Sequence, residues 1–299
     1  MSHKVLCLAG GGTHGLTQMV ALAKKEKEVG DLTKYYDLMI GTSVGAMNAS
    51  VLATGKITAN DLLKIYPDWI KVIFKKNWNP FAFPKYDRKN FMDLFTRKFG
   101  TPKMNDCKTN LIITSVDLCE DRNHYFKSWE KEDGEEQLLD VMLRSFAAPI
   151  FFGAIVDEKT KKVWSDGGTG NNNIPVEDAF TQAILNGWFI NCDTDCVEID
   201  VYGTGFVNGA KSFDEVEKYR WLRQTLDFMD PLNGGLARAQ SRVDQIERMK
   251  IIATALSPRV KFNYWDVEID NKYNGIDNMD FDQLLKYGET MAQKPIIAI

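Results

Sequence analysis

Lys4-Val-Leu-Cys-Leu8 runs directly into Ala9-Gly-Gly-Gly-Thr-His-Gly15, so a short apolar segment meets a glycine-rich turn. The apolar segment predicts a buried strand. Leu16 to Val29, beyond the turn, has apolar residues at helical spacing and a polar face rich in lysine. A strand, a glycine turn and a helix in this order predict the first unit of an α/β fold.

The rest of the chain repeats this alternation. Strand patterns lie at 38–40, 111–116, 197–202 and 261–267, and helical patterns lie at 44–53, 137–146, 177–186, 213–228, 237–256 and 281–293. The alternation predicts an α/β layer fold with a mainly parallel central sheet. Since no Pro/Gly/Ser-rich linker divides the chain, we expect a single domain over residues 1–299. Its motifs lie within about 4–205, and a mostly helical C-terminal part covers about 206–299.

The composition disfavours several classes of protein. Of the 299 residues, 37 are Lys or Arg and 41 are Asp or Glu, which gives a formal net charge of −4. Without a basic excess, a protein dedicated to binding nucleic acid is disfavoured. The five cysteines are mostly scattered, and no second Cys or His pair completes a zinc site. We therefore expect reduced thiols, no metal site and a cytoplasmic location.

No stretch of the sequence has the length of a targeting or membrane-spanning segment. The apolar run Val5 to Ala9 is too short for a signal peptide. Phe146 to Val156, the longest later apolar stretch, is about half of a membrane span. We expect a protein without signal peptide or transmembrane segment, either soluble or peripheral to a membrane.

The glycine turn leaves three interpretations open. Gly10, Gly12 and Gly15 fit the dinucleotide-binding pattern G-x-G-x-x-G, but the acidic residue that should end the second strand is missing, because Asp37 precedes that strand. The turn also lacks the Gly-Lys-Ser/Thr of a P-loop. A second interpretation is a simple tight turn. The third is an oxyanion site, because three consecutive glycines expose several backbone N–H groups at a helix N-terminus.

Gly41-Thr-Ser-Val-Gly45 is a G-x-S-x-G sequence placed between a predicted strand and a predicted helix. This context is typical of a nucleophile elbow, in which a sharp turn exposes the serine hydroxyl. The chain has only three histidines, His3, His14 and His124, and none of the known orders of a Ser-His-Asp triad fits their positions. If Ser43 is a nucleophile, a carboxylate is the natural candidate for its base.

Val163-Trp-Ser-Asp-Gly-Gly168 ends a short predicted strand with an aspartate followed by two glycines. On its own this stretch is also compatible with an ordinary Asp-Gly turn. Taken together, the glycine turn, the elbow and Asp-Gly-Gly resemble the patatin-like phospholipase family. Three further stretches are similar to that family in the same order, and they are Arg144-Ser-Phe-Ala-Ala-Pro-Ile-Phe-Phe152, Asn172-Asn-Ile-Pro175 and Tyr202-Gly-Thr-Gly205. The resemblance spans at least Lys4 to Gly205.

The resemblance implies a three-layer α/β/α fold and a Ser-Asp dyad in place of a triad. Ser43 would be the nucleophile and Asp166 its base. Gly10, Gly11 and Gly12 would form the oxyanion hole, and the supporting glycines of the three motifs would be Gly15, Gly41, Gly45, Gly167 and Gly168. Two departures stand out, since His14 replaces the usual Arg or Lys of the glycine loop and the Asn-Pro stretch is about one residue longer.

The function implied by the resemblance is a lipid acyl hydrolase of phospholipase A or lysophospholipase type, working through an acyl-enzyme without cofactor or metal. Its expected partners are a lipid ester and a membrane surface. Two alternatives stay open. One is a nucleotide-binding or non-catalytic module that uses the glycine loop. The other is an effector that stays inactive until a partner, a nucleotide or formation of a homo-oligomer activates it.

Tyr66 to Tyr86 is unusually rich in rings and cations, with seven aromatic residues, four lysines and one aspartate. Aromatic residues interleaved with lysine suit a lipid–water interface with anionic head groups. The same rings could instead be core around a helix, so the sequence leaves both interpretations open.

Overall fold

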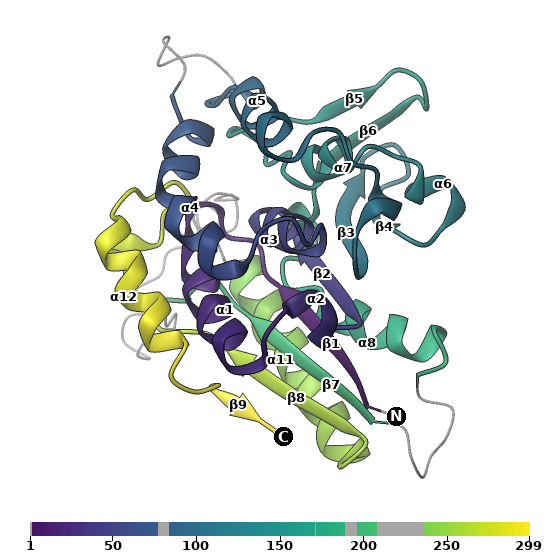
Figure 1. Ribbon diagram of the computed structural model, residues 1–299, viewed down its shortest axis with the longest axis vertical. Coiled ribbons are helices and arrows are strands. Elements are labelled where there is room, and N and C mark those ends of the chain that lie inside the picture. Colours follow the sequence, from purple (N-terminus) through teal and green to yellow (C-terminus); the bar gives the residue numbers. More distant parts are fainter. Residues whose placement is uncertain (1, 77–83, 171, 189–195, 208–235) are drawn as a thin grey trace, which may run out of the picture.

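A nine-stranded sheet runs through the computed structural model, which describes residues 2–76, 84–170, 172–188, 196–207 and 236–299 (Figure 1). The strand order is β5-β6-β3-β2-β1-β7-β8-β9, with β4 also paired to β3. The strands are β1 (Ser2–Leu8), β2 (Leu38–Thr42), β3 (Asn110–Asp117), β4 (Arg122–Lys127), β5 (Ile155–Asp157), β6 (Lys162–Asp166), β7 (Cys196–Tyr202), β8 (Val260–Trp265) and β9 (Ile297–Ala298).

The centre of the sheet is parallel, as the sequence predicts. β1 lies between β2 and β7, β2 also pairs with β3, and β7 also pairs with β8, all in parallel. β4, β5, β6 and β9 are the antiparallel additions at the two sides. The C-terminal part, predicted to be mostly helical, contributes β8 and β9 to this same sheet.

Helices cover both faces of the sheet, so the predicted three-layer α/β/α fold is confirmed (Figure 1). One face carries α1 (Gly15–Val29), α2 (Leu32–Tyr35), α3 (Val44–Ala53), α4 (Ala59–Ile73), α5 (Arg88–Phe99), α7 (Leu138–Ser145) and α12 (Phe281–Met291). The other face carries α8 (Val176–Leu185) and α11 (Leu236–Leu256). The short elements are α6 (Lys131–Gly134) and the 3-10 helices η1 (Gly12–His14), η2 (Met104–Asp106), η3 (Gly167–Thr169) and η4 (Asn271–Tyr273).

Alternate residues of β1 enter two separate cores. Leu6 and Leu8 pack in the core beneath α1, α3 and α4, whereas Val5 and Cys7 pack in the core beneath α8 and α11. A strand buried on both faces reads as a continuous apolar run, which explains the Val-Leu-Cys-Leu sequence. In the described part of the chain, no helix has both the length and the apolar composition of a membrane span. The helix predicted at 213–228 lies outside the described residues.

One edge of β3 is shared by two strands that meet end to end. β2 pairs in parallel with residues 110–114, and β6 pairs antiparallel with residues 115–117. β4 occupies the opposite edge of β3. Thr42 lies opposite Thr114 and Asp166 lies opposite Ser115, so the carboxyl ends of β2 and β6 face each other.

The aromatic segment belongs to the core wherever the structure describes it. α4 continues through Pro67, a residue that reads as a helix breaker in the sequence. The side chains of Tyr66, Trp69, Phe74 and Tyr86 are all buried. The lysines at 71, 75 and 76 are exposed. Trp78, Phe81 and Phe83 lie outside the described residues, so a membrane role for these three rings stays a prediction.

Removing a described ring of this segment should therefore destabilise the fold. Trp69 is 5% exposed and packs edge-on against Phe99, with ring centroids 5.8 Å apart. We expect Trp69→Ala to lower the free energy of unfolding by about 3–5 kcal/mol, because it leaves a cavity in the core. Val72→Ala on the exposed side of the same helix should change it by no more than about 0.5 kcal/mol. Urea denaturation of both variants measures the difference, and equal small effects would contradict the burial of Trp69.

Candidate active site

A cavity of about 180 Å³ lies where β1, β2 and β7 end, and it collects the residues that the sequence singles out. Its lining includes the loop Gly10 to Gly12, Ser43, Asp166 and Gly168. Ser43 follows β2 directly, and Asp166 is the last residue of β6. The shared edge of β3 thus brings the serine and the aspartate to one place, although they are 123 positions apart in the sequence.

Ser43 sits in a strained turn between β2 and α3. Its backbone has φ 54° and ψ −123°, a conformation that residues other than glycine rarely adopt. A Cβ at Gly41 would lie 2.3 Å from the carbonyl oxygen of Gly45, and a Cβ at Gly45 would lie 2.2 Å from that of Leu8. Both glycines of the motif are therefore required by close backbone approach. The geometry agrees with the elbow expected from the sequence.

Asp166 is almost completely buried and is held by the two glycines that follow it. Its Oδ1 accepts a hydrogen bond of 2.7 Å from the N–H of Gly168. A Cβ at Gly167 would lie 2.3 Å from the hydroxyl of Thr114, and a Cβ at Gly168 would lie 2.8 Å from Oδ1 of Asn173. The Asp-Gly-Gly sequence is thus required by the tight packing of this turn as well as by any chemistry of Asp166.

The glycine loop lies against the serine, but its three N–H groups are not equivalent. A Cβ at Gly10 would lie 3.2 Å from the Cβ of Ser43. The N–H of Gly10 already donates to the carbonyl oxygen of Asn173, at 2.9 Å. Among the residues that the structure describes, no carbonyl or side chain accepts from the N–H groups of Gly11 and Gly12. These two groups are therefore the donors that a developing oxyanion could use.

Two distant segments fix the loop in place. Thr204, in the stretch after β7, donates from Oγ1 to the carbonyl oxygen of Gly10 at 2.9 Å. The N–H of Thr13 donates to the carbonyl oxygen of Ile276 at 2.8 Å. Gly12 has φ +60°, and a Cβ there would lie 2.0 Å from that same oxygen. Because these contacts occupy the start of α1, the loop has little room for the phosphates of a nucleotide.

His14 ties both segments to the loop. Its Nδ1 lies 3.1 Å from the carbonyl oxygen of Thr204, and its Nε2 lies 3.1 Å from that of Gly275. Burial lowers the pKa of His14, although the carbonyl oxygens oppose this shift. A neutral imidazole ring has one N–H and can donate to only one of these two oxygens. With both nitrogens engaged, it is also a poor candidate for the base of Ser43.

His124 lies on β4, outside the set of residues that line the cavity. Its ring packs against Phe126 and Trp164, with centroids 4.4 and 5.1 Å away, and burial lowers its pKa. Neither His14 nor His124 is thus placed to act as a base for Ser43. In the described part of the chain, no group of three His, Cys, Asp or Glu side chains is arranged to bind a metal ion.

The lining of the cavity has an aromatic part and a polar part. Phe74, Phe146, Phe151 and Phe152 form the aromatic wall, with Phe146 and Phe152 ring centroids 4.7 Å apart. Arg242 lies on the polar side, 4.6 Å from the centroid of the Phe206 ring. The volume is below the roughly 300–1,000 Å³ of usual small-molecule pockets. The cavity suits the reacting part of a chain-like molecule better than a whole one.

The patatin-like phospholipase family model matches residues 6–180. A cGAMP-activated phospholipase of Escherichia coli (strain TW11681) is 29% identical over 192 residues, which cover 57% of this chain and 53% of that protein. Another, from Vibrio cholerae serotype O1, is 29% identical over 198 residues, 57% of this chain and 55% of that protein. Patatin-like protein 2 of Oryza sativa subsp. japonica is 29% identical over 176 residues, which cover 50% of this chain and 44% of that protein. The chain thus spans about half the length of these relatives.

The buried His14 makes a specific prediction about pH and stability. Because burial lowers its folded pKa below the usual 6.5, the unfolded chain takes up a proton first as the pH falls. His14 therefore contributes a loss of stability that begins near pH 6.5 and grows toward the folded pKa, by at most about 1.4 kcal/mol for each pH unit. His14→Gln keeps one donor and should remove this contribution. Thermal unfolding of both proteins from pH 8 to pH 5.5 measures it, and parallel curves would contradict the neutral, buried ring.

Proposed function

The chain belongs to the patatin-like phospholipase family, and on this basis we propose that it is a lipid acyl hydrolase of phospholipase A or lysophospholipase type, a serine-type carboxylic ester hydrolase. One observation carries the proposal. Ser43 in its strained elbow, Asp166, and Gly11 and Gly12, whose N–H groups have no acceptor among the described residues, all line one cavity. A nucleophile, a base and oxyanion donors are the three parts that acyl transfer needs.

In the proposed mechanism, Asp166 accepts the hydroxyl proton of Ser43, directly or through a water molecule, as Oγ attacks the ester carbonyl carbon. The N–H groups of Gly11 and Gly12 bind the oxyanion of the tetrahedral intermediate. The intermediate collapses to an acyl-enzyme, and the proton on Asp166 passes to the departing alcohol. Water then attacks the acyl group, again with Asp166 as base, and the fatty acid leaves with Ser43 restored.

A carboxylate with an ordinary pKa of about 4 is a weak base for a hydroxyl group. The oxyanion donors therefore have to supply much of the rate enhancement, and their effect is strong in a site that excludes water. Asp166, at 4% exposure, lies in such an environment. The aromatic wall formed by Phe74, Phe146, Phe151 and Phe152 supports an acyl chain as the group that enters the cavity.

The alternatives from the sequence receive unequal support. A nucleotide at the glycine loop is disfavoured, since Thr204 and Ile276 occupy its surroundings. An effector that needs an activator remains a real alternative, because two relatives are named cGAMP-activated phospholipases. Activity is therefore to be measured with and without a cyclic dinucleotide, so that an inactive basal state is not mistaken for a non-catalytic protein.

The dyad predicts a non-additive pair of substitutions. Ser43→Ala and Asp166→Asn should each reduce ester hydrolysis about 10³-fold or more, and the double variant should be scarcely worse, because the two residues act as one unit. His124→Ala is the control and should change turnover little. Mass spectrometry of fatty acids released from phospholipid and lysophospholipid vesicles measures the rates. Additive losses, or a loss at His124 as deep as at Ser43, would contradict the dyad.

We also propose that the end of α4 meets an anionic membrane surface. Lys71, Lys75 and Lys76 are exposed, and they flank Phe74, whose ring lines the cavity. Lys76 also forms a β-bridge with Tyr86, whose ring packs against Phe151 and Phe152 of the aromatic wall. A lipid that approaches from this side would bring its ester group toward Ser43.

Reversing these three charges to Glu should weaken binding to anionic vesicles, since each lysine near such a surface is worth about 1 kcal/mol. The loss should shrink at high salt, where surface charge is screened. Hydrolysis of a short soluble ester should persist. The matched control is Lys34, Lys108 and Lys131 changed to Glu, because these exposed lysines surround the amino ends of β2 and β3. Vesicle sedimentation that falls equally for both triple variants would contradict a specific membrane face at α4.

A further inference from the structure

We propose that Ser145 is a positioning residue for the nucleophile. The short segment Ser145 to Ala147 holds Ser43 and Asp166 in fixed positions relative to each other. The inference rests on the proposed function. Ser145 itself is absent from the cavity lining among the described residues, so it acts through the backbone of Ser43 and not by touching the lipid.

The first contact is at the elbow. The N–H of Ser43 donates a hydrogen bond of 2.9 Å to Oγ of Ser145, whose side chain is fully buried. Ser43 holds φ 54°, and such strain persists only where the surroundings determine the conformation from several sides. A buried N–H group that loses its acceptor raises the free energy of the folded protein. Without this oxygen, the turn would lower its free energy by relaxing away from its present backbone geometry.

The second contact is at the base, two residues further along the same segment. The N–H of Asp166 donates to the carbonyl oxygen of Ala147 at 3.1 Å. Oγ of Ser165 donates to the same oxygen at 3.4 Å. A segment of three residues at the end of α7 is therefore bonded to the backbone of both members of the proposed dyad.

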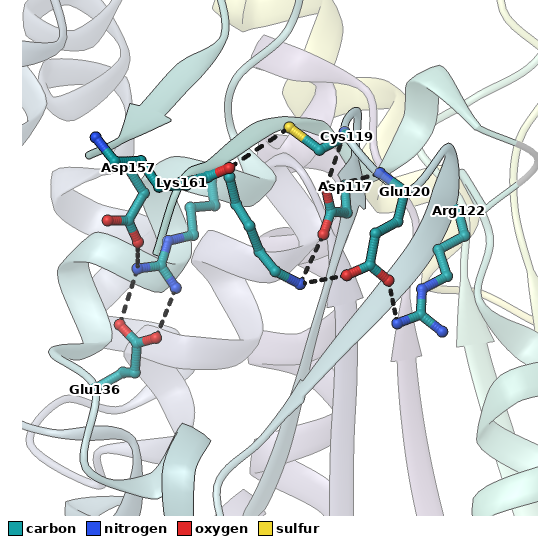
Figure 2. A network of polar contacts seen from close by, with 9 residues as sticks. Asp117, Cys119, Glu120, Arg122, Glu136, Asp157 and Lys161 are labelled. Carbon is teal, nitrogen blue, oxygen red and sulfur yellow. Dashed lines mark hydrogen bonds and ion pairs between the residues drawn. The ribbon is translucent and has the colours of Figure 1, made fainter. Parts of the chain in front are cut away.

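The end of α7 is itself held rigidly, which allows it to serve as a reference point. Arg144 is 7% exposed and forms two hydrogen bonds of 2.9 Å to Glu136 and a third of 3.3 Å to Asp157. Figure 2 labels Glu136 and Asp157, the two carboxylates that bond to this guanidinium group. This group also lies 5.4 Å from the ring centroid of Trp164, two residues before Asp166. The network fixes α7 to the strand that carries the base.

Ser115 completes the connection between α7 and the sheet. Its Oγ lies 3.2 Å from the carbonyl oxygen of Arg144 and 2.7 Å from that of Ser165. Ser115 is also the residue of β3 that pairs with Asp166. Removing the Ser145 oxygen should therefore move Ser43 relative to a base that stays in place. A displacement of this kind slows the chemical step, because small errors in the position of a reacting group are costly.

The test compares Ser145→Thr with Ser145→Val, two side chains of nearly equal size that differ in the hydroxyl oxygen. We expect the threonine variant to keep kcat within about threefold, and the valine variant and Ser145→Ala to lose about 10- to 100-fold, with KM within about twofold of wild type for all three. Labelling of Ser43 by a fluorophosphonate should slow in the same order. Thermal unfolding curves show at which temperatures each variant is folded, and kcat is compared only at those temperatures.

Ser50→Ala is the matched control, since Ser50 is a fully buried serine of α3 whose hydroxyl has no partner in the described structure. It should leave kcat unchanged. Equal kcat for the threonine and valine variants would overturn the inference, and so would a loss at Ser50 as large as at Ser145. If Ser145→Ala does not fold, the threonine and valine pair still decides. A wild-type protein that neither hydrolyses lipid esters nor reacts at Ser43, with and without cyclic dinucleotide, would instead refute the proposed function.

Discussion

The edge of β3 is the constraint on which the site depends. One parallel strand, β2, and one antiparallel strand, β6, fill this edge in succession, and β4 closes the other edge. The opposite directions of β2 and β6 make their carboxyl ends meet, and each end carries one of the two residues proposed to react. A slip of one residue in the pairing of β6 would turn Asp166 to the other face of the sheet. Strand register thus sets the position of the proposed base first, and side-chain contacts act only within that position.

Around this junction, the backbone is forced into positions that only small residues tolerate. The strained φ at Ser43 requires the close approach of Gly41 and Gly45, and the loop at Gly12 leaves no space for a Cβ beside Ile276. Segments distant in sequence then fix these turns through hydrogen bonds, notably at Ser145 and Thr204. Tertiary contacts therefore hold these turns in their strained conformations.

Much of this arrangement could be predicted from the sequence. The first strand, its helix and the elbow were all expected within about two residues of β1, α1, β2 and α3, because apolar periodicity and glycine mark such elements locally. The cavity also brings together Ser43 and Asp166, which the motifs single out. Their roles in catalysis stay proposals.

Other features have no local signature. The use of the Gly10 N–H by Asn173 depends on a contact between residues 163 positions apart. The lowered pKa of His14 depends on burial beneath the segment around Gly275. The rings of α4 could equally have faced a membrane, and only their packing against α1 and α5 identifies the described ones as core. The most direct test of the account is acid-quenched mass spectrometry of the protein during turnover of a phospholipid. The account predicts an acyl group on the peptide that carries Ser43, and lipid hydrolysis with an adduct elsewhere, or at an undiminished rate in Ser43→Ala, would contradict it.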